Sequence, residues 1–152
     1  MPKLWEQLSV VSFQLSDRSE ESLKSEVGAG GGVWSLEVFR RAYALSLDLH
    51  RASQCFPKSE QYGGVADQLR RASKSVCALL AEGSGRQASS DAEFRRYIVM
   101  ALGSVEEAKL WCAYARDLGL VEAPGAGAWQ NGYEEIARML RGLSRHLRKP
   151  RT

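Results

Sequence analysis

Residues 68–86 read QLRRASKSVCALLAEGSGR, and their spacing predicts a helix with two unlike faces. At about 100° per residue, one face is apolar. The apolar face comprises Leu69, Ala72, Val76, Leu79 and Leu80, together with Val65, which lies just before the segment. The other face carries Arg70, Arg71 and Lys74. One side of this helix therefore requires a core, and the other suits anions.

The end of this segment predicts a turn into a second helix. Residues 82–85 read EGSG, and we expect the helix to stop there because glycine readily adopts the left-handed conformation that ends many helices. Arg86 would then lie in the turn. Ser90 and Glu93 have the spacing of a capping box, so a new helix should begin at once.

The composition is that of one ordinary globular domain. The chain has 152 residues, of which 44% are hydrophobic and 26% charged, with a formal net charge of +3. No apolar run approaches the roughly 18 residues of a membrane span, and the N-terminus does not resemble a secretory signal. The three cysteines have no CxxC spacing, which favours buried thiols in a reducing compartment. We therefore expect a cytoplasmic protein.

Charge and glycine content divide the chain near residue 33. Residues 1–32 are acidic on balance, and contain a short amphipathic segment (Leu4, Leu8, Val11, Leu15) and a Gly-rich linker at 28–32. This extension would dock on the body or a partner, or remain disordered without a function. Residues 33–152 form the predicted bundle domain. Its last stretch, 138–152, has six Lys/Arg and no acid.

Three further helices are predicted in this domain, over about 35–53, 91–118 and from between 129 and 133 to 147, with turns at 57–64 and 121–128. No strand pattern is present. Four helices with short connections predict an all-α fold, an antiparallel up-down four-helix bundle.

Two of these helices carry more apolar surface than one core can cover. The helix at 91–118 has an inner face of Phe94, Tyr97, Ile98, Ala101, Val105, Ala108, Cys112 and Ala115, yet other apolar residues point away from it. The helix at 35–53 has two apolar stripes about 140° apart. We expect a subunit interface made by Val38, Leu45, Leu49, Val99, Leu102 and Leu110.

Nothing in the sequence predicts catalysis or a cofactor. His50 and His146 are far apart and lack nucleophile or carboxylate partners at a useful spacing. Glu82, Ser104, Glu106 and Glu107 are the nearest approach to a metal site, but the Glu-x-x-His pattern is missing. We predict no enzyme activity, no cofactor and no metal.

The basic residues predict nucleic-acid binding. On the last helix four arginines lie about 150° from the apolar face. Glu134 is the one acidic residue on this arginine face, and its spacing predicts an ion pair with Arg138. Arginine suits phosphate because its planar fork matches phosphate oxygens. The predicted contacts are Arg70, Arg71, Lys74, Arg86, Arg95, Arg96, Arg138, Arg141, Arg145 and Arg148. No RRM, KH or zinc-finger pattern occurs, so we expect backbone contacts rather than base readout.

An ordered series of short motifs then resembles a known family. The motifs are LEVF at 36–39, FPK at 56–58, QLRRA at 68–72, Ser75, AEG at 81–83, GR at 85–86, EF at 93–94, Tyr97 and ALGSVxE at 101–107. Together they resemble the bacterial four helix bundle proteins, often labelled rRNA intervening-sequence proteins. The series spans about residues 33–148.

The resemblance implies a homopentameric barrel, related to the accessory variability determinant of diversity-generating retroelements, which binds nucleic acid and a reverse transcriptase. Carried over by motif, Arg70, Arg71 and Arg86 would be contacts. Phe39 stands where Trp is common, and Cys77 and Leu79 replace a frequent Pro and Asn. We expect a non-enzymatic scaffold that binds nucleic acid, RNA above all. The alternative is a protein-interaction adaptor tethered through residues 1–32.

Overall fold

The structure is a computed structural model and describes residues 32–87 and 89–149. A 3-10 turn, η1 (Val33–Ser35), leads into α3 (Glu37–Ser53), and the short α4 (Lys58–Gln61) precedes α5 (Val65–Arg86). Two long helices follow, α6 (Asp91–Asp117) and α7 (Ala123–Leu147). No strand occurs within these ranges. The all-helical prediction is confirmed, and α4 is an addition within the predicted turn at 57–64.

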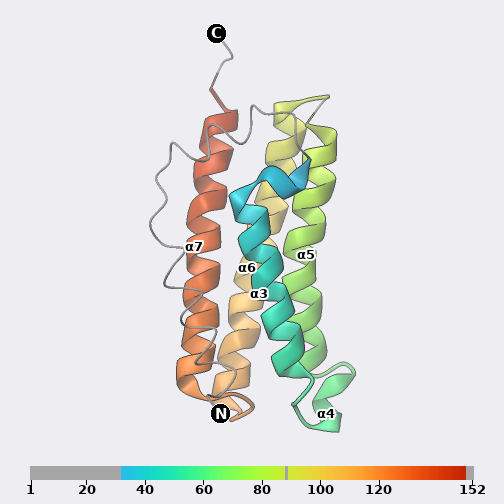
Figure 1. Cartoon of the computed structure of the whole chain (residues 1–152), viewed down its shortest axis with the longest axis vertical. Helices are drawn as coiled ribbons and strands as arrows, with labels where there is room; N and C mark the ends of the chain where they lie inside the picture. The colour runs from blue at the N-terminus through green and yellow to red at the C-terminus, as the bar shows by residue number, and fades with distance from the viewer. Residues whose placement is uncertain (1–31, 88, 150–152) are drawn as a thin grey trace.

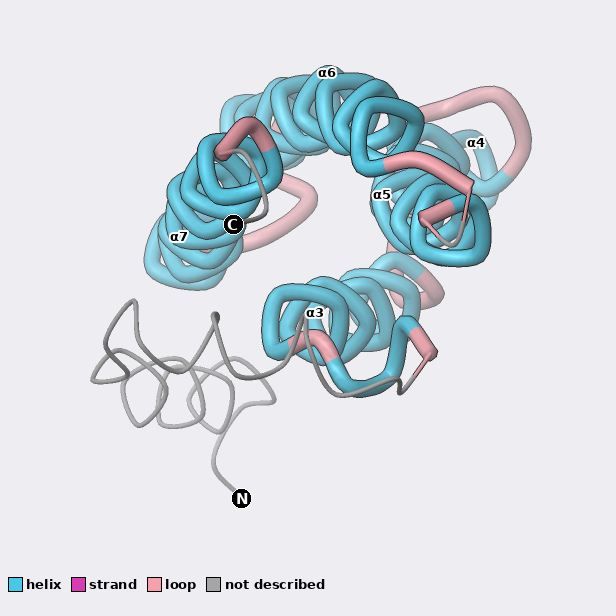
Figure 2. Tube along the Cα trace, turned by 90° about the horizontal axis from the view of Figure 1, so that it is seen from above, coloured by secondary structure: helices cyan, strands magenta, loops and turns pink. Residues whose placement is uncertain are grey.

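The four long helices lie side by side around one core (Figure 2). The most extensive packing joins α5 to α6, followed by α6 with α7 and α3 with α5, while α3 and α7 touch less. Figure 2 shows α5 and α7 on opposite sides of the ring, separated by α6 and α3. The end of α5, the start of α6 and the end of α7 lie together at the upper end of Figure 1.

Helix α5 does not end at residues 82–85, where the two glycines led us to expect its end. It continues through Gly83 and Gly85 to Arg86, and neither glycine has a positive φ. Gly83 is buried, and a Cβ atom there would lie 2.5 Å from Tyr97 Cβ. This glycine therefore allows α5 and α6 to approach closely, which is a different reason for glycine from helix termination.

Helix α6 agrees with its prediction at both ends. The Ser90 side chain accepts hydrogen bonds from the backbone N–H groups of Ala92 (3.1 Å) and Glu93 (3.3 Å), and so caps the helix. Gly119 follows the helix with φ +70°, a conformation that glycine tolerates. All eight residues of the predicted inner face are buried.

Helix α7 begins well before its predicted start. It opens at Ala123, within the Gly/Pro/Ala stretch that the sequence suggested as a loop. Pro124 occupies the first turn, where its missing N–H has no intrahelical partner to lose. Gly125 and Ala126 are buried, so this first turn is covered on one side by the rest of the bundle.

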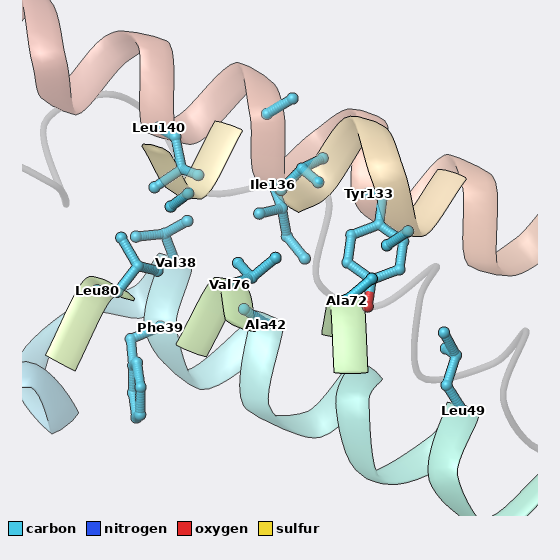
Figure 3. Close-up of a cluster of buried hydrophobic side chains, with 14 of the residues drawn as sticks. Val38, Phe39, Ala42, Leu49, Ala72, Val76, Leu80, Tyr133, Ile136 and Leu140 are labelled. Carbon is cyan, nitrogen blue, oxygen red and sulfur yellow. The ribbon is translucent and has the colours of Figure 1, made fainter. Parts of the chain in front are cut away.

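The core contains part of the apolar surface that we assigned to a subunit interface. Val38 and Leu49 on α3 are fully buried, at 0% exposure, and Figure 3 shows both among the core side chains. Leu45 is partly buried and lies against Gly132 of α7, where a Cβ would be 2.9 Å from Leu45 Cδ2. The interface prediction is therefore wrong for Val38 and Leu49, because α5 and α7 together cover both sides of α3.

Candidate nucleic-acid interface

Arg70 is half-buried, and its guanidinium is engaged by groups of the protein. Its guanidinium donates to Ser53 Oγ (3.0 Å), to Gln61 Oε1 (3.0 Å) and to the Gln61 carbonyl (2.8 Å). These bonds tie α5 to the end of α3 and to α4. Three of the five N–H donors are thus engaged within the chain, which makes Arg70 an anchor of this corner of the fold.

Arg71 and Lys74 are exposed on the same helix. Arg71 pairs with Asp67 (3.1 Å) one turn earlier, and 74% of its side chain remains exposed. The pKa of the nearby His50 on α3 is lowered, first by burial and then by the positive charges of Lys74, Arg70 and Arg51. Positive charge therefore gathers where α3 and α5 meet, and Arg51 is a member that the sequence analysis missed.

Arg86 and Arg96 meet over one aromatic ring at the α5–α6 end. Their guanidinium carbons lie 5.6 and 5.5 Å from the centroid of Tyr97. Tyr97 OH donates to Glu82 (2.8 Å), and this hydrogen bond is the main reason that the pKa of the phenol is raised. Acids offset the arginines here, because Arg86 also pairs with Glu82 and Arg96 with Glu93. Arg95 is half-buried beside them.

The arginines of α7 form the least compensated basic surface. Arg138 pairs with Glu135 (Nε to Oε2, 3.0 Å) rather than with the predicted Glu134, which pairs instead with Lys109 of α6. Arg141, Arg145 and Arg148 are exposed, and none of them has a salt bridge to a residue between 32 and 149 that the structure describes. His146 and Lys149 add to this end of the helix, which lies at the upper end of Figure 1.

The ten predicted contacts therefore form three groups rather than one surface. Lys74 and Arg70 lie toward His50 of α3, with Arg71 next to Arg70 on α5, while Arg86 and Arg96 share Tyr97. The α7 group lies across the bundle from α5 (Figure 2). Sequence periodicity places each residue on its own helix, but the order of helices around the core determines which groups meet.

A fourth charged group, on α3, was missed by the sequence analysis. Glu37 accepts from Arg40 (2.9 Å) and Arg41 (3.2 Å), and Arg41 also reaches Glu135 of α7 (3.8 Å). The arginines on either side hold the pKa of the Glu37 carboxyl below its usual value, although its burial opposes them. The i, i+3 and i, i+4 spacing of these residues was the available signal.

An apolar strip lies on the outer side of α6. Val99 is 60% exposed and Leu110 is 52% exposed, as predicted for residues that face away from the core, whereas Leu102 is half-buried. The strip is extended by Met100, Tyr114 and Leu118. Large exposed apolar patches on a small domain are typical of interaction surfaces.

The described residues contain no cluster of metal ligands, and two of the three thiols are shielded. No group of three His, Cys, Asp or Glu side chains could hold a metal ion there. Burial raises the pKa of Cys77 to about 11 and that of Cys112 to about 12, so both are unreactive thiols. Cys55 is exposed, which corrects the prediction of three buried thiols.

Comparison with known proteins identifies the family. The model of the 23S rRNA-intervening sequence protein family matches residues 35–142. The chain belongs to this family. Its match covers α3 to most of α7 and includes Arg141, whereas Arg145 and Arg148 lie beyond its end. Among curated proteins, no relative matches at a significant level.

A solved structure supports the family fold. A crystal structure from Bacteroides thetaiotaomicron, described as a protein of unknown function from the S23 ribosomal protein family, is similar to this chain with a TM-score of 0.60. The two are 18% identical, and the similarity covers 68% of this chain and 94% of the other. No helix among the described residues is long and apolar enough to cross a membrane.

Proposed function

We propose that this chain is a non-enzymatic scaffold that binds RNA through arginine-rich helix surfaces. The observation that carries the proposal is the α7 surface, where Arg141, Arg145 and Arg148 are exposed without a described ion-pair partner. Arginines in this state have all five N–H donors available for phosphate oxygens. The membership in a family named for an rRNA insert is consistent with an RNA ligand.

The scaffold would be an up-down bundle that assembles as a homopentamer. Short connections between consecutive long helices favour antiparallel neighbours, and the exposed strip on α6 supplies the surface for assembly. Replacing Val99 and Leu110 with Asp should lower the mass measured by light scattering while helix content is kept. Tyr62→Asp is the control, because Tyr62 is 93% exposed and lies between α4 and α5. An unchanged mass in the double variant would contradict assembly through α6.

Further parts of the proposal concern partners and location. By its resemblance to the accessory variability determinant, the scaffold would serve a reverse transcriptase of a diversity-generating retroelement, in the cytoplasm. The free thiols suit a reducing compartment. Copurification with a reverse transcriptase encoded nearby would test this part separately from RNA binding.

RNA binding is tested by charge reversal on α7. Fluorescence anisotropy with a labelled RNA pool, over a series of salt concentrations, should give an affinity that falls linearly in a log–log plot, with a slope of about 0.7 to 0.9 per neutralised phosphate. The Arg141→Glu/Arg145→Glu variant should reduce both affinity and slope. Lys58→Glu/Arg116→Glu makes the same change in net charge at sites outside the four basic groups.

The two double variants separate a specific surface from net charge. If both lose affinity equally, the α7 surface has no special role, and only overall charge matters. If neither wild type nor variants bind RNA at low salt, the proposal fails and the protein-adaptor alternative replaces it. Circular dichroism on each variant checks that the bundle is still folded.

A further inference from the structure

Three aromatic rings cluster where η1 meets α3. Trp34 lies edge-to-face against Phe39 (centroids 4.8 Å apart, planes at 85°) and against Tyr43 (5.0 Å, 76°). Phe39 and Tyr43 are stacked at 6.1 Å. Phe39 is buried and fixes the cluster to the core, whereas Trp34 is 58% exposed and Tyr43 is 39% exposed. Two large aromatic rings are thus presented to solvent in a fixed arrangement.

The cluster is held by an arginine rather than by apolar packing alone. Arg40 donates from Nη1 to the Trp34 carbonyl (2.7 Å) and from Nη2 to Glu37 (2.9 Å). The side chain of Arg40 therefore spans from α3 to η1 and fixes the backbone of Trp34. The Ser35 hydroxyl donates to the Gly32 carbonyl (2.9 Å) and tightens the same turn.

Positive charge continues along the same side of α3. His50 follows Tyr43 by seven residues, which is two helical turns on the same face. Besides burial, which lowers the pKa of the His50 imidazole most, the positive charges of Lys74, Arg70 and Arg51 lie close enough to lower it further. Two acids lie nearby: Asp67 is paired with Arg71, and Asp48 of α3 interacts with Arg51. The rings therefore stand at one end of a face with a surplus of positive charge.

We propose that Trp34 and Tyr43 form a stacking platform for unpaired bases of single-stranded RNA, with the phosphate backbone running along the α3–α5 face. This inference rests on the proposed RNA-binding function and adds the kind of RNA. Aromatic side chains stack on bases that are splayed out, whereas bases within a duplex are covered by their neighbours. Exposed rings at one end of a face that carries arginine and lysine suit the first ligand.

The surrounding charge argues for RNA over a second subunit. The apolar strip on α6 is a separate surface, and its exposed side chains are mainly aliphatic. A partner that covers the Trp34 cluster and continues along the α3–α5 face must, by contrast, match π-faces at one end and positive charge at the other. A single strand of RNA supplies a base for the first and phosphates for the second.

The test uses the full chain and two labelled probes. The probes are a single-stranded oligoadenylate of about 12 nucleotides, within the usual range of site sizes, and an RNA duplex with the same number of phosphates. The variants are Trp34→Leu and Tyr43→Leu, which keep an apolar side chain but remove the π-face. Tyr62→Leu is the matched control, because Tyr62 is 93% exposed and stacks on no other ring among the described residues.

Stacking predicts a loss confined to the single strand. Trp34→Leu should weaken oligoadenylate binding about 5- to 150-fold, the range for removing one stacked aromatic ring, and should change duplex binding little. Quenching of tryptophan fluorescence on oligoadenylate binding should shrink in the same variant. Tyr62→Leu should behave as wild type.

Three other outcomes would overturn the inference in distinguishable ways. Equal affinity of wild type and Trp34→Leu for oligoadenylate would remove the platform but leave RNA binding through α7 intact. A lower mass of Trp34→Leu in light scattering would assign the cluster to a subunit contact. Absence of RNA binding by wild type would reject the proposed function itself, and the platform with it.

Discussion

The close approach of α5 and α6 can be tested at Gly83. A Cβ atom at this position would lie 2.5 Å from Tyr97 Cβ, 3.0 Å from Phe94 Cδ2 and 3.1 Å from Tyr97 Cγ. Tyr97 Cβ is bonded to the backbone of α6, so no side-chain rotation can move it away. The Gly83→Ala substitution must therefore separate the two helices that share the most extensive packing in the bundle.

The expected magnitude combines two opposing effects. Inserting a methyl group into a packed interface costs typically about 1–3 kcal/mol. Alanine is the better helix former, and returns about 0.5–1 kcal/mol. The net effect should be a loss of about 1–2 kcal/mol in the free energy of unfolding. For a domain of this size, that corresponds to a decrease of about 4–8 °C in Tm.

Gly85 provides a matched control in the same helix. A Cβ atom there would have nothing within 4 Å, so Gly85→Ala should stabilise the protein by about 0.5–1 kcal/mol through helix propensity alone. Thermal and urea unfolding followed by circular dichroism, at one protein concentration, measures both variants. If Gly83→Ala is as stable as Gly85→Ala, the close helix contact at Gly83 is wrong.

Other features of the structure lead to further predictions. Arg70→Ala should lower the free energy of unfolding by about 2–4 kcal/mol, because it leaves Ser53 and Gln61 without their charged donor. Arg71 is exposed, so Arg71→Ala should lower it by less than about 0.5 kcal/mol. Urea unfolding measures both variants. Folding lowers the pKa of His50 below its ordinary value of 6.5, so the unfolded chain takes up the proton first and stability should fall as pH drops below about 6.5. His50→Gln should weaken this pH dependence, and an unchanged pH profile would contradict the burial of His50 beside positive charges. In the native protein at pH 8, a thiol reagent should modify the exposed Cys55 quickly, and Cys77 and Cys112 only when the protein unfolds. Rapid modification of all three cysteines would contradict the shielding of Cys77 and Cys112.

Helix α6 shows how far periodicity alone can reach. Its cap at Ser90, its end before Gly119 and its eight buried residues were all predicted, because a long helix repeats its pattern over many turns and its ends use local hydrogen bonds. The exposed positions of Val99 and Leu110 follow from the same arithmetic. For the candidate site, periodicity likewise placed the α7 arginines on the solvent side of their helix.

The failures all involve contacts between helices. Gly83 was predicted to end a helix and the 123–128 stretch to form a loop, yet both are helical, and Gly83, Gly125 and Ala126 are buried in the bundle. Arg138 was given Glu134 as its partner, but Lys109 of α6 takes that carboxylate. Trp34 drew no attention in the sequence, since its exposure depends on how η1 folds back on α3.

The sequence by itself determined the all-helical class, the approximate extent of the long helices and the side of each helix on which charge lies, because these depend on spacing within one segment. Only the tertiary structure decided that Arg70 is an internal anchor, that Val38 and Leu49 belong to the core, and that the basic residues form separate groups. These properties depend on which helices are neighbours, and that is set by the packing of distant segments around a shared core.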